Sequence, residues 1–192
     1  MAADPLETRE FGTVAQWEQW LTERHADSPG LWLKLRKKEP GADWLDYQQA
    51  LEIALCFGWI DGQKAAFDDR YWLQRFTPRR ARSKWSKINR DKATALIEQG
   101  RMRPAGLAEV ELARADGRWD AAYASSSTAE VPEDLAAALA ANPAAAAFFA
   151  TLDRANRYAI LYRVQEPKRP QTRAKRIETF VAMLAAGEKL HP

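Results

Sequence analysis

The residues with the most specific chemistry lie between positions 72 and 89, where basic and aromatic side chains are interleaved. Six basic residues fall within thirteen positions: Arg75, Arg79, Arg80, Arg82, Lys84 and Lys87. The planar fork of an arginine suits phosphate and carboxylate groups. Three aromatic residues lie among them: Trp72, Phe76 and Trp85. Rings among cations are typical of surfaces on which nucleobases stack. The segment therefore predicts a site for an anion.

A helix start in the same segment supports this prediction. Ser86-x-x-Asn89 has the pattern of a helix N-terminus, where free backbone N–H groups and the positive end of the helix dipole favour an anion. The expected ligand-binding residues are Arg75, Arg79, Arg80, Lys84, Trp85, Ser86 and Asn89. A second interpretation stays open, in which the basic face is only solvated and the aromatic side chains fill the interface between a hairpin and a helix. Trp85 by itself favours that core role.

Asp61 is the candidate for acid–base catalysis. It lies between Ile60 and Gly62, where it could sit beside Arg75 on a hairpin and act as a general base if burial raised its pKa. The alternative is a turn-forming residue or a partner for an arginine. An enzyme that uses Asp61 with arginines as anion clamps is therefore a second hypothesis, beside a non-enzymatic binder of an anionic ligand or partner.

The residues needed for several other chemistries are scarce. The chain has one cysteine, Cys56, inside an apolar run that is typical of a buried core thiol, and two histidines, His25 and His191. This set does not supply a zinc site or a Ser-His-Asp triad. Glycine-rich phosphate loops of the usual spacings are absent from the sequence. We therefore expect neither a metal nor a cofactor.

Charge is distributed unevenly along the 192 residues. The net charge is +3, but residues 63–103 hold 12 basic and 4 acidic residues, whereas residues 1–62 have a net charge of −5. This asymmetry indicates an anionic partner. A second basic cluster, residues 168–176, could extend a nucleic-acid surface, or it could be a helix entry with its charges in water. A direct nucleic-acid binder is therefore a third hypothesis.

Composition places the chain among globular proteins. Hydrophobic residues make up 46% and charged residues 29%. No apolar run approaches the ~20 residues that cross a bilayer. The first twelve residues include acidic side chains and lack the apolar core of a signal peptide. The cytoplasm is therefore the expected location, with no membrane insertion.

The first hundred residues predict an α+β domain of order α-β-α-β-β-α with a small, mostly antiparallel sheet. Residues 1–10 are expected to be a loose leader. The strict alternation of Leu31–Arg36 indicates a half-buried strand. The remaining elements are helices at 13–26, 46–57 and 86–100, a loop at 37–45, and a hairpin of strands 59–67 and 71–77. Tryptophans 17, 20, 32 and 44 are expected in the core or at a domain interface, and Ile88, Leu96 and Ile97 on the buried side of the third helix.

The rest of the chain predicts helices only. Residues 101–131 are expected to form a bridge, with a helix that starts at Pro104 and a linker at 125–128. Residues 132–192 are expected to be a small all-helical domain. Its helices should start near Pro132, Asn142, Asp153 and Thr172, and the last should bury Ile177, Phe180, Val181 and Leu184.

Several motifs together resemble one known family. They are FGWIDGQ (57–63), RFTPRR (75–80), SKWSKIN (83–89), GRMRPAGLAEVELARADGRW (100–119) and ETFVAMLAAGEKL (178–190). In this order they resemble the YdeI/OmpD-associated, or bacteriocin-protection, family over nearly the whole chain. The resemblance implies a part in bacterial stress or bacteriocin resistance, association with an outer-membrane porin, and a small helical C-terminal domain over residues 132–190. It carries no catalytic residues over to this chain.

Overall fold

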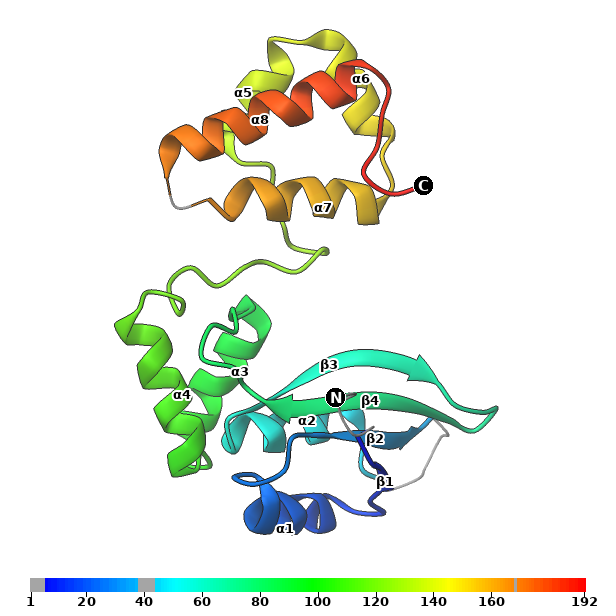
Figure 1. The fold of residues 1–192 in the computed structure, drawn as a ribbon, viewed down its shortest axis with the longest axis vertical. Helices are drawn as coiled ribbons and strands as arrows, with labels where there is room; N and C mark the ends of the chain where they lie inside the picture. The colour runs from blue at the N-terminus through cyan, green and yellow to red at the C-terminus, as the bar shows by residue number, and fades with distance from the viewer. Residues whose placement is uncertain (1–5, 38–43, 168) are drawn as a thin grey trace, which may run out of the picture. The chain divides into compact units, whose positions relative to one another are not determined.

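The computed structural model describes residues 6–37, 44–167 and 169–192, and the chain divides into two compact units, residues 1–122 and 123–192 (Figure 1). The first unit contains a four-stranded mixed sheet with helices beside it, and the second contains helices. The predicted fold class, α+β followed by a small all-helical part, is confirmed.

The sheet of the first unit has the strand order β1-β2-β4-β3. Its strands are β1 (Thr8–Glu10), β2 (Leu31–Arg36), β3 (Trp59–Ala66) and β4 (Tyr71–Pro78). β1 runs parallel to β2, and the other two pairings are antiparallel. Side chains alternate along each strand, so the two faces of the sheet carry different residues. Leu31, Leu33 and Leu35 are buried on the inner face, as predicted.

The prediction of a loose leader over residues 1–10 is wrong for its last part. Thr8–Glu10 forms β1, and the N–H of Trp32 donates to the carbonyl oxygen of Glu7 at 2.8 Å. The strand covers an edge of β2 that would otherwise have unpaired backbone groups. Three polar residues, Thr-Arg-Glu, carry no hydrophobic alternation, so the sequence held no signal for it. Residues 1–5 of the leader and 38–43 of the predicted loop lie outside the described residues.

Three of the four helices of the first unit begin directly after a capping side chain, and the fourth begins at a proline. They are α1 (Val14–Arg24), α2 (Tyr47–Cys56), α3 (Lys87–Glu98) and α4 (Pro104–Ala115). Asp46 and Gln49 form a complete capping box, in which each side chain accepts from the other residue's backbone N–H. Gly58, with φ of +74°, follows α2 in the left-handed conformation that glycine adopts readily.

Aromatic side chains form much of the core of the first unit. Trp17 and Trp20 are buried and stack at 5.5 Å between ring centroids. Cys56 is also buried, and burial raises the pKa of its thiol to about 11, as expected for a core thiol. The prediction that Ile88 is buried is wrong, because this residue, in the first turn of α3, is 50% exposed. Trp44, expected in the core or at a domain interface, is 42% exposed and so is not a core residue.

Helix α4, which the sequence placed in a bridge, packs within the first unit. A Cβ atom on Gly106 would lie 2.3 Å from the carbonyl oxygen of Cys56, so the close approach of α4 to α2 requires a glycine there. Val110 and Ala113 are buried on the same side. After α4, Trp119 returns to the core, where its ring lies 4.9 Å from that of Trp85.

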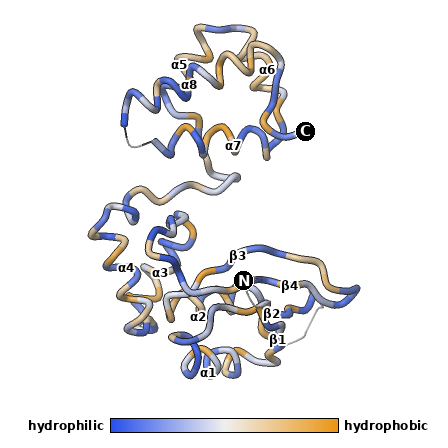
Figure 2. Tube along the Cα trace, viewed as in Figure 1, coloured by the Kyte–Doolittle hydropathy of each residue, from blue (hydrophilic) through white to orange (hydrophobic). Residues whose placement is uncertain are grey.

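The second unit consists of α5 (Glu133–Ala140), α6 (Pro143–Thr151), α7 (Arg154–Gln165) and α8 (Pro170–Ala185). Figure 2 shows that α6 is hydrophobic along most of its length. Asn142 and Asp153 cap α6 and α7 as predicted. The last helix starts at Pro170 rather than at Thr172, because proline fits the first helical position. Ile177, Phe180 and Leu184 are buried.

Among the described residues, no single helix has the length and hydropathy of a membrane span. Among these residues, only α5 and α6 taken together have that length and hydropathy, and the two helices are bent by 119° relative to each other.

Candidate functional site

The basic segment, defined here as residues 75–90, runs from the end of β4 through a loop into α3. Strand β4 ends at Pro78. Ser86 starts α3, and its Oγ accepts from the N–H of Asn89 at 3.1 Å. Between them a turn is closed by two bonds: the N–H of Arg80 donates to Ser83 Oγ at 3.0 Å, and the N–H of Ser83 donates to the carbonyl oxygen of Arg80 at 2.8 Å. The loop therefore has a defined backbone.

Arg79, a predicted anion ligand, faces the core. It is 6% exposed, and its guanidinium carbon lies 3.6 Å from the centroid of the Trp85 ring. Its Nη1 donates to the carbonyl oxygen of Lys84 at 3.4 Å, and its backbone N–H donates to the carbonyl oxygen of Gly58 at 2.9 Å. A desolvated cation on a tryptophan face is a strong contact. Arg79 therefore holds the loop against the core.

The aromatic residues of the segment also face inward. Trp85 is 1% exposed and Phe76 is fully buried, while Trp72 is partly buried and packs against the core. The alternation of β4 explains this placement, because residues 72, 74 and 76 share the inner face with the leucines of β2. In this structure the rings fill the interface between hairpin and helix, which was the second interpretation of the sequence. Trp85 and Phe76 offer no open face for stacking.

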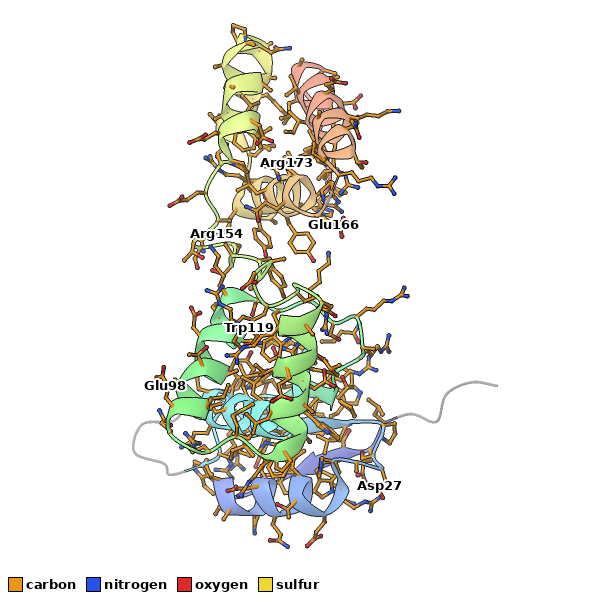
Figure 3. The ribbon with its side chains drawn as sticks, turned by 90° about the vertical axis from the view of Figure 1, so that its left-hand side faces the viewer. Asp27, Glu98, Trp119, Arg154, Glu166 and Arg173 are labelled. Atoms are coloured by element: carbon orange, nitrogen blue, oxygen red, sulfur yellow. The ribbon has the colours of Figure 1, made fainter. Side chains whose placement is uncertain are left out.

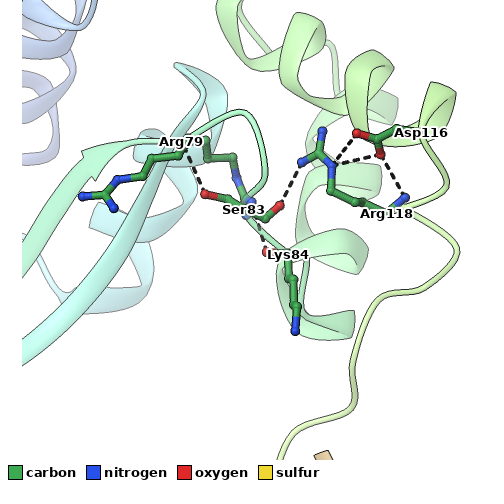
Figure 4. A network of polar contacts seen from close by, with 6 residues as sticks. Arg79, Ser83, Lys84, Asp116 and Arg118 are labelled. Atoms are coloured by element: carbon green, nitrogen blue, oxygen red, sulfur yellow. Dashed lines mark hydrogen bonds and ion pairs between the residues drawn. The ribbon is translucent and has the colours of Figure 1, made fainter. Parts of the chain in front are cut away.

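A residue that the sequence analysis missed, Arg118, clamps the loop from outside the segment (Figure 4). Its Nη1 donates to the carbonyl oxygen of Ser83 at 2.8 Å, and its Nε donates to both carboxylate oxygens of Asp116 at 2.9 and 2.7 Å. The arginine lies 35 positions from the serine, and the local pattern carries no signal for the contact. The carboxylate orients the guanidinium, and the guanidinium fixes the loop.

Four other cations of the segment lie at the surface. Arg80, Arg82, Lys84 and Lys87 are exposed. Within residues 6–37, 44–167 and 169–192, no carboxylate oxygen lies within 4 Å of the charged nitrogens of Arg80, Arg82 or Lys87. Asn89, also predicted as a ligand, is buried at 7% exposure. The loop therefore displays positive charge on a backbone that other residues hold in place.

Asp61 and Arg75 do not come together as predicted. Asp61 pairs with Phe76 across the hairpin, so its side chain lies on the inner face, whereas Arg75 lies on the outer face, opposite Trp32. Asp61 instead accepts from the hydroxyl of Tyr47 at 2.9 Å. Burial, followed by the neighbouring carboxylate, raises the pKa of Tyr47 well above its usual range. The geometry makes Asp61 the partner of a tyrosine on α2, and its catalytic role stays a prediction.

Two arginines of the second basic cluster have partners within their own unit. Arg173 donates to both carboxylate oxygens of Asp134, at 2.5 and 2.9 Å, and to the carbonyl oxygen of Val164. Arg176 bonds to Glu166 at 3.0 Å and to the carbonyl oxygen of Arg163 (Figure 3 labels Arg173 and Glu166). The hydrogen bond from Arg173 holds the pKa of Asp134 below its usual value. Lys168 lies outside the described residues.

Metal ligands are not gathered anywhere in the described part of the chain. No group of three or more His, Cys, Asp or Glu side chains there is placed to hold a metal ion.

Comparison with known proteins identifies two families. Residues 9–109 match a family model described as a domain of unknown function (DUF8412), and residues 128–187 match one described as bacteriocin-protection, YdeI or OmpD-associated. The predicted resemblance is thus confirmed for the helical C-terminal part, although the match does not extend to the motifs before residue 128. The comparisons with curated proteins and with solved structures found no significant match. The chain belongs to the DUF8412 family, whose domain covers more than half of it, and it carries a YdeI/OmpD-associated domain at its C-terminal end.

Proposed function

We propose that this protein is a binding protein that holds an anionic ligand or partner through the loop at residues 79–87. One observation carries the proposal: Arg80, Arg82 and Lys87 are exposed and have no carboxylate partner among the described residues. Most surface cations gain a little free energy from a nearby acid. Three neighbouring cations without one produce a positive potential that attracts anions.

The fixed backbone of the loop supports the same proposal. Arg79 is stacked on Trp85, and Arg118 donates to Ser83, so the loop is held on both sides. A ligand that binds a preorganised loop loses less free energy to ordering it. Arginine also suits phosphate and carboxylate groups because its N–H groups bind them in pairs. Phosphate-bearing ligands fit this chemistry best.

Binding of inorganic tripolyphosphate to the full chain tests the proposal. Isothermal titration at low salt should show binding that weakens as salt rises, and Arg80→Ala/Arg82→Ala should raise Kd about tenfold or more, the equivalent of ~1.4 kcal/mol. Arg24→Ala/Arg101→Ala removes the same charge from exposed arginines that have acidic partners, Asp27 and Glu52, and should change Kd less than about twofold. Equal affinities for the wild type and the loop variant would show that the assigned site is wrong.

A further inference from the structure

The outer face of the sheet is a second surface on which cations and rings are interleaved. We define it by three residues of β2, namely Trp32, Lys34 and Arg36, and by the residues opposite them on β4. The antiparallel register places Arg75 opposite Trp32, and Tyr71 opposite Arg36. Helices α1 and α2 pack on the other side, against the leucines of β2 (Figure 1). Trp32, Lys34, Arg36 and Arg75 remain only half-buried.

The rings and cations of this face are in direct contact. The Nζ of Lys34 lies 3.9 Å from the ring centroid of Tyr71 and 4.8 Å from that of Phe67. Arg36 donates from Nε to the hydroxyl of Tyr71 at 3.1 Å, and its guanidinium lies 3.8 Å from the centroid of Trp44. These contacts fix the orientation of the rings. Two of the rings are exposed to solvent: Phe67 is 51% exposed and Trp44 is 42% exposed.

Arg75 is the residue of this face that is best suited to bind an anion. Its Nε is buried and has no hydrogen-bond partner among the described residues, and no carboxylate there lies within 4 Å of its guanidinium. Gly62, on the neighbouring strand, has no side chain to cover the aliphatic part of Arg75. A Cβ atom at Gly62 would lie 3.8 Å from the Cβ and Cδ of that arginine. A guanidinium without partners in a half-buried position favours an anion that can accept several N–H groups.

We propose that the outer face of the sheet binds single-stranded nucleic acid. Bases would stack on the exposed rings, led by Phe67, and the phosphates would lie along Arg75 and Arg36, because Lys34 already pairs with Glu10 at 3.4 Å. A single strand fits better than a duplex, because a duplex keeps the faces of its bases inside the stack, whereas sheets with exposed aromatic residues bind unpaired bases. The site is separate from the 79–87 loop, and its cations and rings do not depend on the loop being an anion site.

Fluorescence anisotropy with a labelled oligothymidine and an oligouridine of equal length tests this assignment on the full chain. The wild type should bind either single strand more tightly than a duplex that contains the same thymidine strand. Phe67→Ala should raise Kd roughly fivefold or more, the low end of the loss for one stacked base. Arg75→Gln should raise Kd and reduce the dependence on salt. Unequal Kd values for the two oligonucleotides would show whether the site prefers DNA or RNA.

Two matched variants make the test specific. Leu112→Ala truncates a side chain on α4 that is as exposed as Phe67, at 53%, and Arg101→Gln removes an exposed arginine elsewhere in the unit. Both should bind like the wild type. The inference is overturned if the duplex binds as tightly as the single strand, if Phe67→Ala retains the wild-type Kd, or if no single strand binds at low salt. Loss of tripolyphosphate binding in the loop variant, with single-strand binding intact, would separate the two sites.

Discussion

The two basic regions look alike in sequence and differ in the structure. Residues 79–87 and residues 169–176 each contain several arginines, yet Arg173 and Arg176 are engaged by acids and carbonyl oxygens of their own unit. In the loop, Arg79 is similarly engaged, but Arg80 and Arg82 have no carboxylate nearby among the described residues. The density of positive charge in a sequence thus says little about a binding site. The position of the nearest acids decides which charges remain available.

Arg79→Ala gives the largest expected effect on stability. The change removes a buried guanidinium stacked on Trp85 and a bond to the carbonyl oxygen of Lys84, so the free energy of unfolding should fall by about 2 kcal/mol or more. Urea unfolding of the full chain measures it. Arg101→Ala, at an exposed ion pair, should cost no more than about 1 kcal/mol. A similar small loss in both variants would mean that Arg79 does not hold the loop.

Arg80→Ala/Arg82→Ala should change binding without changing the fold. Its free energy of unfolding should stay within about 0.5 kcal/mol of the wild type, because both side chains are exposed. The slope of log affinity for tripolyphosphate against log salt should become shallower, because two of the cations that attract the anion are gone. Titration of tripolyphosphate over a salt series gives this slope. An unchanged slope would mean that these arginines touch no phosphate.

Arg173→Ala should have a small effect that depends on pH. The ion pair with Asp134 is partly exposed, so at neutral pH its loss should cost about 1 kcal/mol or less. Because the pKa of Asp134 is lowered in the folded protein, the stabilisation is present above the carboxyl's ordinary pKa and is lost as pH falls through the lowered pKa. The difference in unfolding free energy between wild type and variant should therefore shrink in acid. A difference that is the same at both pH values would rule out this pair as its source.

Local patterns predicted most of the fold. The strand at Leu31–Arg36 and the helix predicted at residues 46–57 are confirmed, and each has a physical reason within a few residues: the alternation of the strand, the Asp46–Gln49 capping box and Gly58 after α2. Thr13 shows the limit of such patterns. Thr13 and Gln16 have the spacing of a capping box, and the Thr13 side chain caps α1, but the Oε1 of Gln16 accepts from the N–H of Gly12 instead of that of Thr13.

The site was harder to predict, because long-range contacts decide it. Arg118 donates to the carbonyl oxygen of Ser83, 35 positions away in the sequence. The hydroxyl of Tyr47 donates to the carboxylate of Asp61, 14 positions away. The two strands of the hairpin were predicted, but the placement of Arg75 and Asp61 depends on the register between β3 and β4, which puts them on opposite faces. The exposed ring of Phe67 follows the hairpin strand, where no periodic pattern indicated a role.

We propose that the 79–87 loop, and not the 169–176 cluster, supplies the anion-binding charge. Tripolyphosphate binding by Arg80→Ala/Arg82→Ala and by the charge-matched Arg173→Ala/Arg176→Ala, at one low salt concentration, tests this claim most directly. The loop variant should bind about tenfold more weakly than the wild type, and the cluster variant should bind like it. Equal losses in the two variants, or a loss only in the cluster variant, would contradict the account.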